Sequence, residues 1–188
     1  MATDVLLLVR AQTLRGVAST EGRMTFEELV RGYEDEVYGL ALRILGDRDA
    51  ALEAANLAFQ KAYRAFDRYD PSRPVRYWLL RIAANEVISA GRRRSRERAR
   101  TAMADAGSSV QDARPGPESV AIGREEAASI RAAVLALPER YRVPIVLRYF
   151  NDLTIDEVAR VTGRRASTVG VQLLRARALL RASLEDVR

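Results

Sequence analysis

The sequence has no cysteine and no histidine among its 188 residues. Without cysteine it forms neither a disulfide nor a thiolate metal site, and without histidine it lacks the commonest general base. Aromatic residues are only 6% of the chain, and Lys61 is its one lysine. No catalytic constellation of side chains is visible. We therefore expect a protein that is not an enzyme and that holds no cofactor and no metal.

Long hydrophobic runs are also missing. The apolar run at residues 5–9 is too short for the core of a signal peptide, and Asp4 precedes it where a positive charge is expected. No run approaches the ~20 apolar residues of a membrane-spanning helix. These absences predict a cytoplasmic protein with no membrane insertion.

Positive charge and apolar residues are what the chain does have. Its net charge is +6, its isoelectric point is about 10.1, and 48% of its residues are apolar. A packed core is therefore available, and a basic balance favours a polyanionic partner such as nucleic acid. Charge alone decides little, because a generic basic surface has the same composition.

Apolar residues recur at spacings of three and four through residues 24–94, which is the period of an amphipathic helix. Gly46 interrupts this pattern, and an alanine-rich second helix is expected over residues 50–66. Two prolines mark residues 67–74 as a loop. A third helix is expected over residues 75–91. No stretch alternates apolar and polar residues as a half-buried strand does.

The chain divides by composition into four parts. Residues 1–23 read as an extension and residues 24–98 as a first helical domain. Residues 99–122 are rich in Gly, Ser and Pro, which is typical of a flexible linker. Helical periodicity returns over residues 123–188. The predicted fold class is therefore all-α, with two small helical domains joined by a linker.

The second domain carries the most specific local motif. Thr154 is followed three residues later by Glu157, which is the spacing of a capping box at a helix start. Gly163 supplies a turn, and a second helix is expected from about Ala166. Two short helices joined by such a turn predict a helix-turn-helix. Three arginines near the second helix favour DNA binding over a plain helical hairpin: Arg164, Arg165 and Arg175.

The third helix of the first domain has a mixed aromatic, amide and basic face. Helical spacing places five residues on it: Trp78, Arg81, Asn85, Ser89 and Arg92. Aromatic rings stack on bases, amides bind base edges and arginines bind phosphates, so this face suits unpaired DNA. Two plainer interpretations stay open, because the tryptophan suits a core and the arginines that follow suit a solvated helix end.

With these motifs in place, the chain resembles a bacterial RNA polymerase sigma factor of the extracytoplasmic-function (ECF) group of the sigma-70 family. The resemblance covers about residues 26–94 and 125–181. It is carried by the order and spacing of LALRILGDRDAA, FQKAYRAFDRYDPSRPVRYWLLRIAANEVI, ALPERYRVPIVLRYFNDLTIDEVARVTG and STVGVQLLRARALL.

The resemblance implies a division of labour. The first domain, similar to sigma region 2, is expected to bind the beta-prime clamp helices of core RNA polymerase. It is also expected to hold the melted minus-ten element, with a base flipped into a pocket. The second domain, similar to sigma region 4, is expected to read the minus-thirty-five element as duplex. Expected partners are core polymerase, including its beta flap, promoter DNA and an anti-sigma factor.

The resemblance also assigns residues to each role. Minus-ten DNA binding is expected from Asp67, Arg68, Tyr69, Arg73, Trp78, Arg81, Asn85, Arg92 and Arg93. Minus-thirty-five DNA binding is expected from Arg164, Arg165, Ser167, Thr168, Val171, Gln172 and Arg175. Core-polymerase binding is expected from Leu52, Glu53, Asn56, Leu57 and Gln60.

Two departures from the family pattern keep alternatives open. Leu52 and Leu57 stand where family members usually carry acidic residues, so they form either a more apolar interface or part of the core. Gly170 and Val171 stand where a basic and a polar residue are frequent. The alternatives are a sigma-like regulator or anti-sigma decoy with weakened contacts, and a stand-alone helix-turn-helix regulator.

Overall fold

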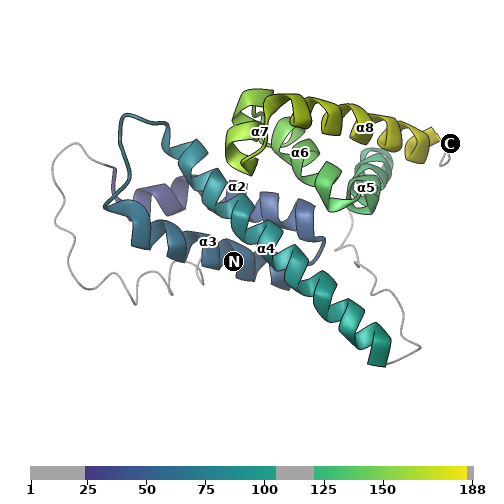
Figure 1. The fold of residues 1–188 in the computed structure, drawn as a ribbon, viewed down its shortest axis with the longest axis horizontal. Helices are drawn as coiled ribbons and strands as arrows, with labels where there is room; N and C mark the ends of the chain where they lie inside the picture. Colours follow the sequence, from purple (N-terminus) through teal and green to yellow (C-terminus); the bar gives the residue numbers. More distant parts are fainter. Residues whose placement is uncertain (1–23, 105–120, 186–188) are drawn as a thin grey trace.

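The computed structural model describes residues 24–104 and 121–185. Within these ranges the chain forms seven α-helices and no β-strand, which confirms the all-α prediction (Figure 1). The predicted extension at residues 1–23 lies outside the described residues, and so does most of the predicted linker. No helix in the described part is long and apolar enough to cross a bilayer.

Three helices form the first unit: α2 (Phe26–Leu45), α3 (Arg48–Phe66) and α4 (Val75–Ala104). A capping box between Thr25 and Glu28 starts α2, and Gly46 ends it. Gly46 has a φ of 70°, a left-handed conformation that glycine adopts without a Cβ clash. Asp47 follows at once and accepts the Ala50 N–H at 2.8 Å, which caps α3. This tight turn brings α3 back against α2.

The third helix is longer than its sequence pattern predicts. We expected it to end near Gly91, but α4 continues to Ala104 and takes in the first residues of the predicted linker. Arginine, glutamate and alanine are good helix formers, and no proline interrupts the stretch. A single glycine inside a helix costs only about 1 kcal/mol, so Gly91 does not stop it.

Four helices form the second unit: α5 (Ala121–Ala136), α6 (Glu139–Tyr149), α7 (Ile155–Thr162) and α8 (Ala166–Glu185). The predicted capping box is present, because the Thr154 N–H donates to Glu157 at 2.7 Å and the Glu157 N–H donates to Thr154 Oγ1 at 3.3 Å. Gly163 ends α7 with a φ of 67°. The helix-turn-helix prediction is confirmed by α7, this turn and α8.

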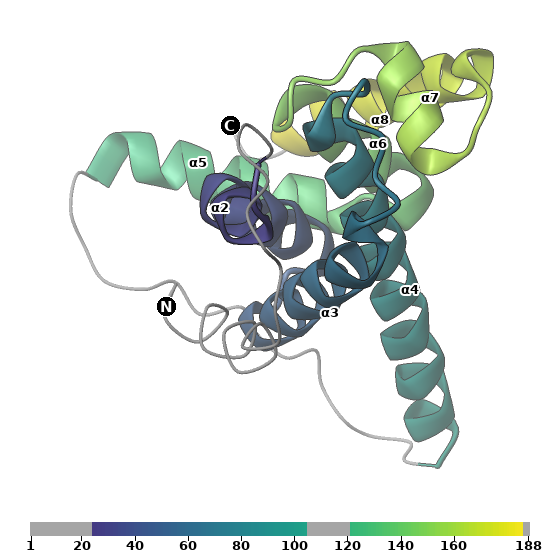
Figure 2. The ribbon, with the colours of Figure 1, turned by 90° about the vertical axis from the view of Figure 1, so that its left-hand side faces the viewer.

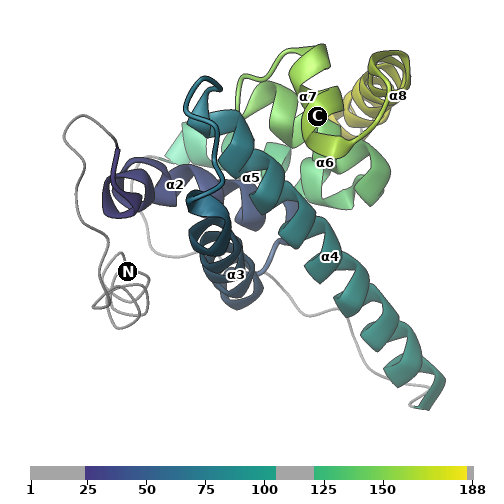
Figure 3. The same cartoon turned by 60° about the vertical axis from the view of Figure 1, so that its left-hand side comes forward.

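The two units pack directly against each other. Their buried apolar residues form one continuous cluster, in which α2 contacts α5 and α6 while α4 contacts α6 and α7. Figures 2 and 3 show the other consequence of this packing, since the far end of α4 projects away from all other helices. The sequence pattern predicted two tethered modules and did not predict their contact.

Candidate nucleic-acid interface

α4 presents the predicted mixed face to solvent. Arg81, Asn85, Ser89 and Arg92 are all exposed. The opposite stripe of the same helix is closed, with four residues at most 1% exposed: Leu80, Ala83, Ala84 and Val87. The amide of Asn85 therefore lies on an open surface flanked by guanidinium groups, with a donor and an acceptor to offer.

Trp78 fits both interpretations of the sequence in part, because it is neither fully buried in the core nor fully exposed. Its ring is half-buried and packs on Tyr69 with ring centroids 5.0 Å apart and on Phe66 at 6.3 Å. Burial also raises the pKa of the Tyr69 hydroxyl. The tryptophan is therefore part of an aromatic cluster that joins α3, the following loop and α4, and only its outer part is open to a ligand.

The loop at residues 67–74 is organised by its own hydrogen bonds. The Tyr69 hydroxyl donates to the Arg73 carbonyl, and the Ser72 N–H donates to Asp70 Oδ1 at 3.0 Å. Hydrogen bonds from Ser72 hold the pKa of Asp70 below its usual value. Asp67, Arg68 and Arg73 are exposed along this loop. The loop candidates and the candidates on α4 are therefore exposed or half-buried.

The arginine stretch has two kinds of member. Arg93 is exposed, and Arg92 is exposed beside Glu139 of α6, with Nε 3.6 Å from Oε1. Arg94, in contrast, donates to Asp47 at 2.8 Å and holds the pKa of that carboxyl at about 2. Arg94 thus anchors α4 on the start of α3, a role that its sequence position did not indicate.

The candidate polymerase-binding residues lie together on α3. Glu53 is exposed, while Leu52, Asn56, Leu57 and Gln60 are half-buried. Leu52 packs against the core cluster, as the plainer interpretation of that leucine held. The Asn56 carbonyl oxygen is buried without a hydrogen-bond partner. This surface combines apolar and amide groups with a single carboxylate.

α8 has a buried side and an exposed side. Val169, Leu173 and Ala176 are buried, and Val171 is 49% exposed on the far side. At about 100° per residue, Val171 lies roughly 200° from Val169, close to the centre of the outward face. The other exposed candidates on this surface are Arg165, Ser167, Thr168 and Arg175.

Several polar candidates on α8 or just before it already have partners within the protein. Arg164 donates to Gln172 Oε1 at 2.9 Å, and both side chains are half-buried. A hydrogen bond from Arg175 lowers the pKa of the Tyr141 hydroxyl on α6. A Cβ added to Gly170 would meet no atom within 4 Å. The centre of this outward face is therefore uncharged, with arginines at its margins.

Comparison with known proteins shows which family the chain belongs to. Residues 29–97 match the Sigma-70 region 2 family, and residues 127–180 match the Sigma-70 region 4 family. The ECF RNA polymerase sigma factor SigW of Bacillus subtilis is 32% identical over 168 residues, which cover 86% of this chain and 90% of SigW. The chain belongs to the ECF sigma factors. It is a promoter-directing RNA polymerase sigma factor.

Other comparisons agree with this assignment. The sigma-H factor of Pseudomonas aeruginosa is 30% identical over 88% of this chain and 89% of its own. The fold matches RpoE of Bartonella quintana, solved in complex with the anti-sigma factor NepR, with a TM-score of 0.69, 20% identity, and coverage of 87% of this chain and 98% of that one. CnrH, solved with the cytosolic domain of CnrY, matches at a TM-score of 0.63 and 25% identity over 86% of this chain and 88% of its own.

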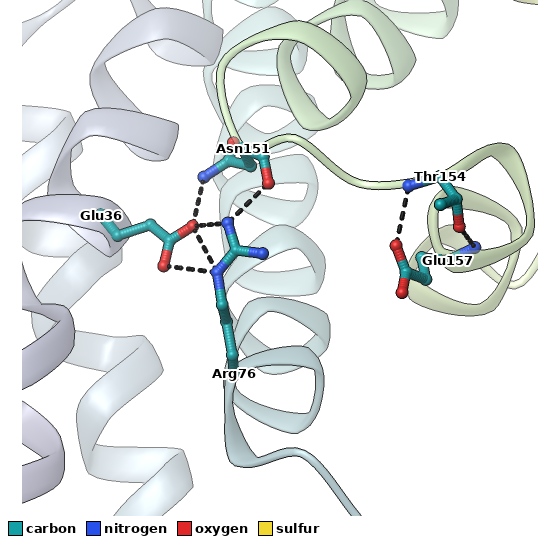
Figure 4. A network of polar contacts seen from close by, with 5 residues as sticks. All are labelled: Glu36, Arg76, Asn151, Thr154 and Glu157. Atoms are coloured by element: carbon teal, nitrogen blue, oxygen red, sulfur yellow. Dashed lines mark hydrogen bonds and ion pairs between the residues drawn. The ribbon is translucent and has the colours of Figure 1, made fainter.

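A polar network joins the two units of this sigma factor, and Figure 4 shows it from close by. Arg76 at the start of α4 donates from Nη2 to Glu36 Oε1 at 2.5 Å and from Nε to both carboxylate oxygens at 3.1 Å. The same Nη2 donates to the Asn151 carbonyl at 2.5 Å, and Asn151 Nδ2 donates to Glu36 at 3.1 Å. Asn151 is only 2% exposed.

Two further contacts cross the same boundary. Arg142 of α6 donates to the Ile44 carbonyl at the end of α2 at 2.6 Å, and burial lowers the pKa of its guanidinium. Tyr77 donates to Glu157 of α7, which raises the pKa of the tyrosine and lowers that of the glutamate. Sequence reasoning missed these residues, because their partners lie far away along the chain. In the described residues, no group of acidic side chains is arranged to hold a metal ion.

Proposed function

We propose that this sigma factor reads a promoter at two places, using the open face of α4 for melted minus-ten DNA and the open face of α8 for minus-thirty-five duplex. The observation that carries the proposal is the pair of exposed faces on one chain. Each face joins groups for phosphate to groups for bases, and together they account for most of the exposed candidate residues.

The face of α4 suits a single strand better than a duplex. An unpaired base exposes its ring and its Watson–Crick edge, and aromatic stacking is worth about 1–3 kcal/mol per base. Asn85 supplies a donor and an acceptor for such an edge, while Trp78 and Tyr69 supply aromatic surface beside it. Extruding a base costs a few kcal/mol, which contacts on this face must recover. Arg92 and Arg93 then hold the backbone.

The face of α8 suits the major groove. In a helix-turn-helix the second helix enters that groove and its outward residues meet the base edges. Arg165 and Arg175 lie at the margins of the outward face, where phosphates pass, and Ser167, Thr168 and Val171 lie between them. Arg164 and Gln172 act as a bonded pair.

The surface of α3 is our candidate for core polymerase. Leu57, Asn56 and Gln60 leave part of their side chains open beside the exposed Glu53. The open parts of these side chains offer apolar and amide groups to a partner such as the beta-prime clamp helices. With one carboxylate in the set, we propose that docking here depends more on apolar contact and amide hydrogen bonds than on charge steering.

An anti-sigma factor is the further partner that we propose. The related sigma factor RpoE was solved with the anti-sigma factor NepR, and the likeness covers 87% of this chain. A partner of this kind would control when the two DNA-binding faces are available.

The deciding experiment is run-off transcription with purified core polymerase on a promoter from the factor's own operon. Core polymerase alone is the control, and transcripts that start at one position only with the sigma factor support the proposal. Core binding without promoter-dependent transcripts would point to the decoy alternative. DNA binding without any core binding would point to a stand-alone regulator.

The α8 face is tested by the salt dependence of duplex binding. Arg165→Ala and Arg175→Ala should each weaken binding to a minus-thirty-five duplex. A lost phosphate contact should lower the salt slope by about one unit. Arg177→Ala, an exposed arginine on another side of α8, is the matched control. Unchanged affinity and slope in both test variants would exclude this face.

The α3 surface is tested by replacement. A variant with serine at Glu53, Asn56, Leu57 and Gln60 should lose core binding while keeping its helical circular dichroism. The control places serine at two exposed residues of α2, Glu27 and Arg31. Core binding that survives the first set of changes would show that the interface lies elsewhere.

A further inference from the structure

Gln172 lies on one row of α8 with two exposed residues of the proposed minus-thirty-five face. Residues three or four apart in a helix are neighbours on its surface, and Gln172 follows Thr168 by four positions and precedes Arg175 by three. Thr168 and Arg175 are exposed, whereas Gln172 is half-buried. A duplex bound along this row would meet the amide of Gln172 between the two exposed side chains.

Arg164 holds this amide in one orientation. The residue precedes α8 and donates from Nη1 to Gln172 Oε1 at 2.9 Å. The same nitrogen donates to the Arg140 carbonyl of α6 at 3.4 Å. A guanidinium has donors and no acceptor, so only the oxygen of the glutamine amide can bond to it. The Nε2 group, with its two N–H donors, is therefore the branch of the amide that remains for a ligand.

The neighbouring guanidinium changes which base this glutamine can recognise. A free glutamine donates to adenine N7 and accepts from adenine N6, and adenine is its usual partner in the major groove. The bond from Arg164 occupies one lone pair of Oε1. The positive charge beside that oxygen opposes a second donor, such as the amino group of adenine or cytosine. What Gln172 keeps for a base is therefore a pair of donors.

We propose that Gln172 reads guanine in the minus-thirty-five duplex as a hydrogen-bond donor, and that Arg164 positions it for this contact. The inference rests on the proposed binding of that duplex by α8. Guanine presents two neighbouring acceptors in the major groove, N7 and O6, and no other base presents two. The two N–H groups of Nε2 match them. This role also fits the burial of the adjacent arginines, because Arg165 is exposed while Arg164 is half-buried and bonded to both α6 and α8.

Base substitution in the bound duplex tests the contact with guanine. A duplex is selected from random DNA by the purified factor, each base pair is replaced in turn, and affinity is measured by fluorescence anisotropy. At one position, the parent should bind guanine at least about fivefold more tightly than adenine, which is the lower end of the discrimination that a good base contact gives. Gln172→Ala should remove that difference and keep the preferences at all other positions.

Further variants change the chemistry of the pair at the same place on α8. Gln172→Glu keeps an oxygen for Arg164 but replaces the Nε2 donor with an acceptor, so the preference at that position should move from guanine to cytosine, whose N4 donates. Arg164→Ala frees Oε1, so the preference should move from guanine to adenine. Arg164→Lys can still donate to Oε1 and should keep guanine. Arg177→Ala, an exposed arginine on another side of α8, is the matched control.

A guanine preference that survives in Gln172→Ala or Gln172→Glu would overturn the contact with guanine, and one that survives in folded Arg164→Ala would overturn the positioning role. An equal loss of affinity on every sequence would mark Gln172 as a phosphate contact and would overturn the inference too. A parent without any sequence preference would instead contradict the proposed function, so the two failures are distinguishable. Helical circular dichroism checks that each variant is folded, and Gln172→Glu decides the question if Arg164→Ala is not.

Discussion

The two proposed DNA-binding faces of this sigma factor differ in which of their polar groups already have hydrogen-bond partners within the protein. On α4 the amide of Asn85 is exposed, and the aromatic rings of Trp78 and Tyr69 pack together about two helical turns earlier. On α8 the amide of Gln172 is bonded to Arg164, and Val171 occupies the centre of the outward face. The first face therefore offers hydrogen bonds to bases, and the second offers mainly apolar contact.

This difference matches the two DNA structures that the faces would meet. An unpaired base has a hydrogen-bonding edge that an amide can satisfy, as Asn85 can. The major groove of a duplex carries one apolar group, the thymine methyl, which an aliphatic side chain such as Val171 can contact. On the proposed assignment, one chain would read two forms of DNA with two kinds of chemistry.

The largest effect should come from Asn85→Ala. Loss of a base-edge contact costs about 1–3 kcal/mol, which is roughly 5- to 150-fold in the opening equilibrium of a fully paired promoter. A template with a pre-melted bubble should recover part of the loss, because the opening cost is gone. Permanganate reactivity of melted thymines measures opening. Ser89→Ala, one turn farther along the same face, is the control. If the Asn85→Ala variant opens the promoter as well as the parent does, Asn85 has no hydrogen-bonding role in opening.

A second, smaller effect is expected at Val171, where we predict apolar contact with a thymine methyl group. Duplexes selected from random DNA by the purified factor are scanned by replacing each thymine with uracil, which removes one methyl group. Burial of one methyl is worth about 0.8 kcal/mol, so one position should lose about fourfold in affinity. Val171→Ala should abolish that loss, whereas Leu174→Ala should not. If Val171→Ala changes the effect of uracil at no position, the proposed contact between Val171 and a thymine methyl group is wrong.

Gly170→Ala should stabilise the protein by about 0.5–1 kcal/mol, because alanine loses less backbone entropy in a helix and no atom lies within 4 Å of the added Cβ. Thermal unfolding measures the gain. Gly46→Ala is the contrast, since Gly46 has a positive φ and its Cβ would lie 2.9 Å from Leu135 Cδ2. A loss of DNA affinity in Gly170→Ala would show that the groove comes closer to α8 than we infer.

The smallest effect concerns the anchor of α4 on Asp47. The Arg94 guanidinium lowers the pKa of this carboxyl from 3.8 to about 2, so its stabilising effect is present above about pH 4 and is lost as the pH falls through 2. Asp47→Asn keeps the helix cap but loses the ion pair. Because the aspartate is 40% exposed, the loss at neutral pH should be only about 0.5 kcal/mol. Chemical denaturation at several pH values should show this difference vanish below about pH 2.

Local features of the fold were predictable from the sequence and distant ones were not. The capping box of Thr154 and Glu157 and the turn at Gly163 follow from residues a few positions apart, and the structure confirms both. The pairing of Arg76 with Glu36 spans 40 residues, and its bond to Asn151 spans 75. Such contacts depend on how whole helices pack, which no spacing rule gives.

The candidate sites show the same limit. Helical spacing correctly separated the exposed side of α4 from its buried side. It did not show that Gln172 is engaged by Arg164 or that Arg94 is held by Asp47, because charge and spacing look the same for a DNA contact and for an internal bond. The assignment of residues to promoter elements and to polymerase stays a prediction.

The length of α4 fixes the distance between Asn85 and the arginines at the far end of the helix. A helix rises 1.5 Å per residue, so Arg100 lies about 22 Å beyond Asn85 along one straight axis, which is about six base steps of duplex. The arginine end of this helix projects clear of the other helices (Figure 3). If Asn85 fixes the position of one base, the distal arginines must meet the backbone at a constant offset from it. Every promoter that the factor opens should then show a protected patch in its hydroxyl-radical footprint at the same distance from the flipped base, whatever the sequence between them.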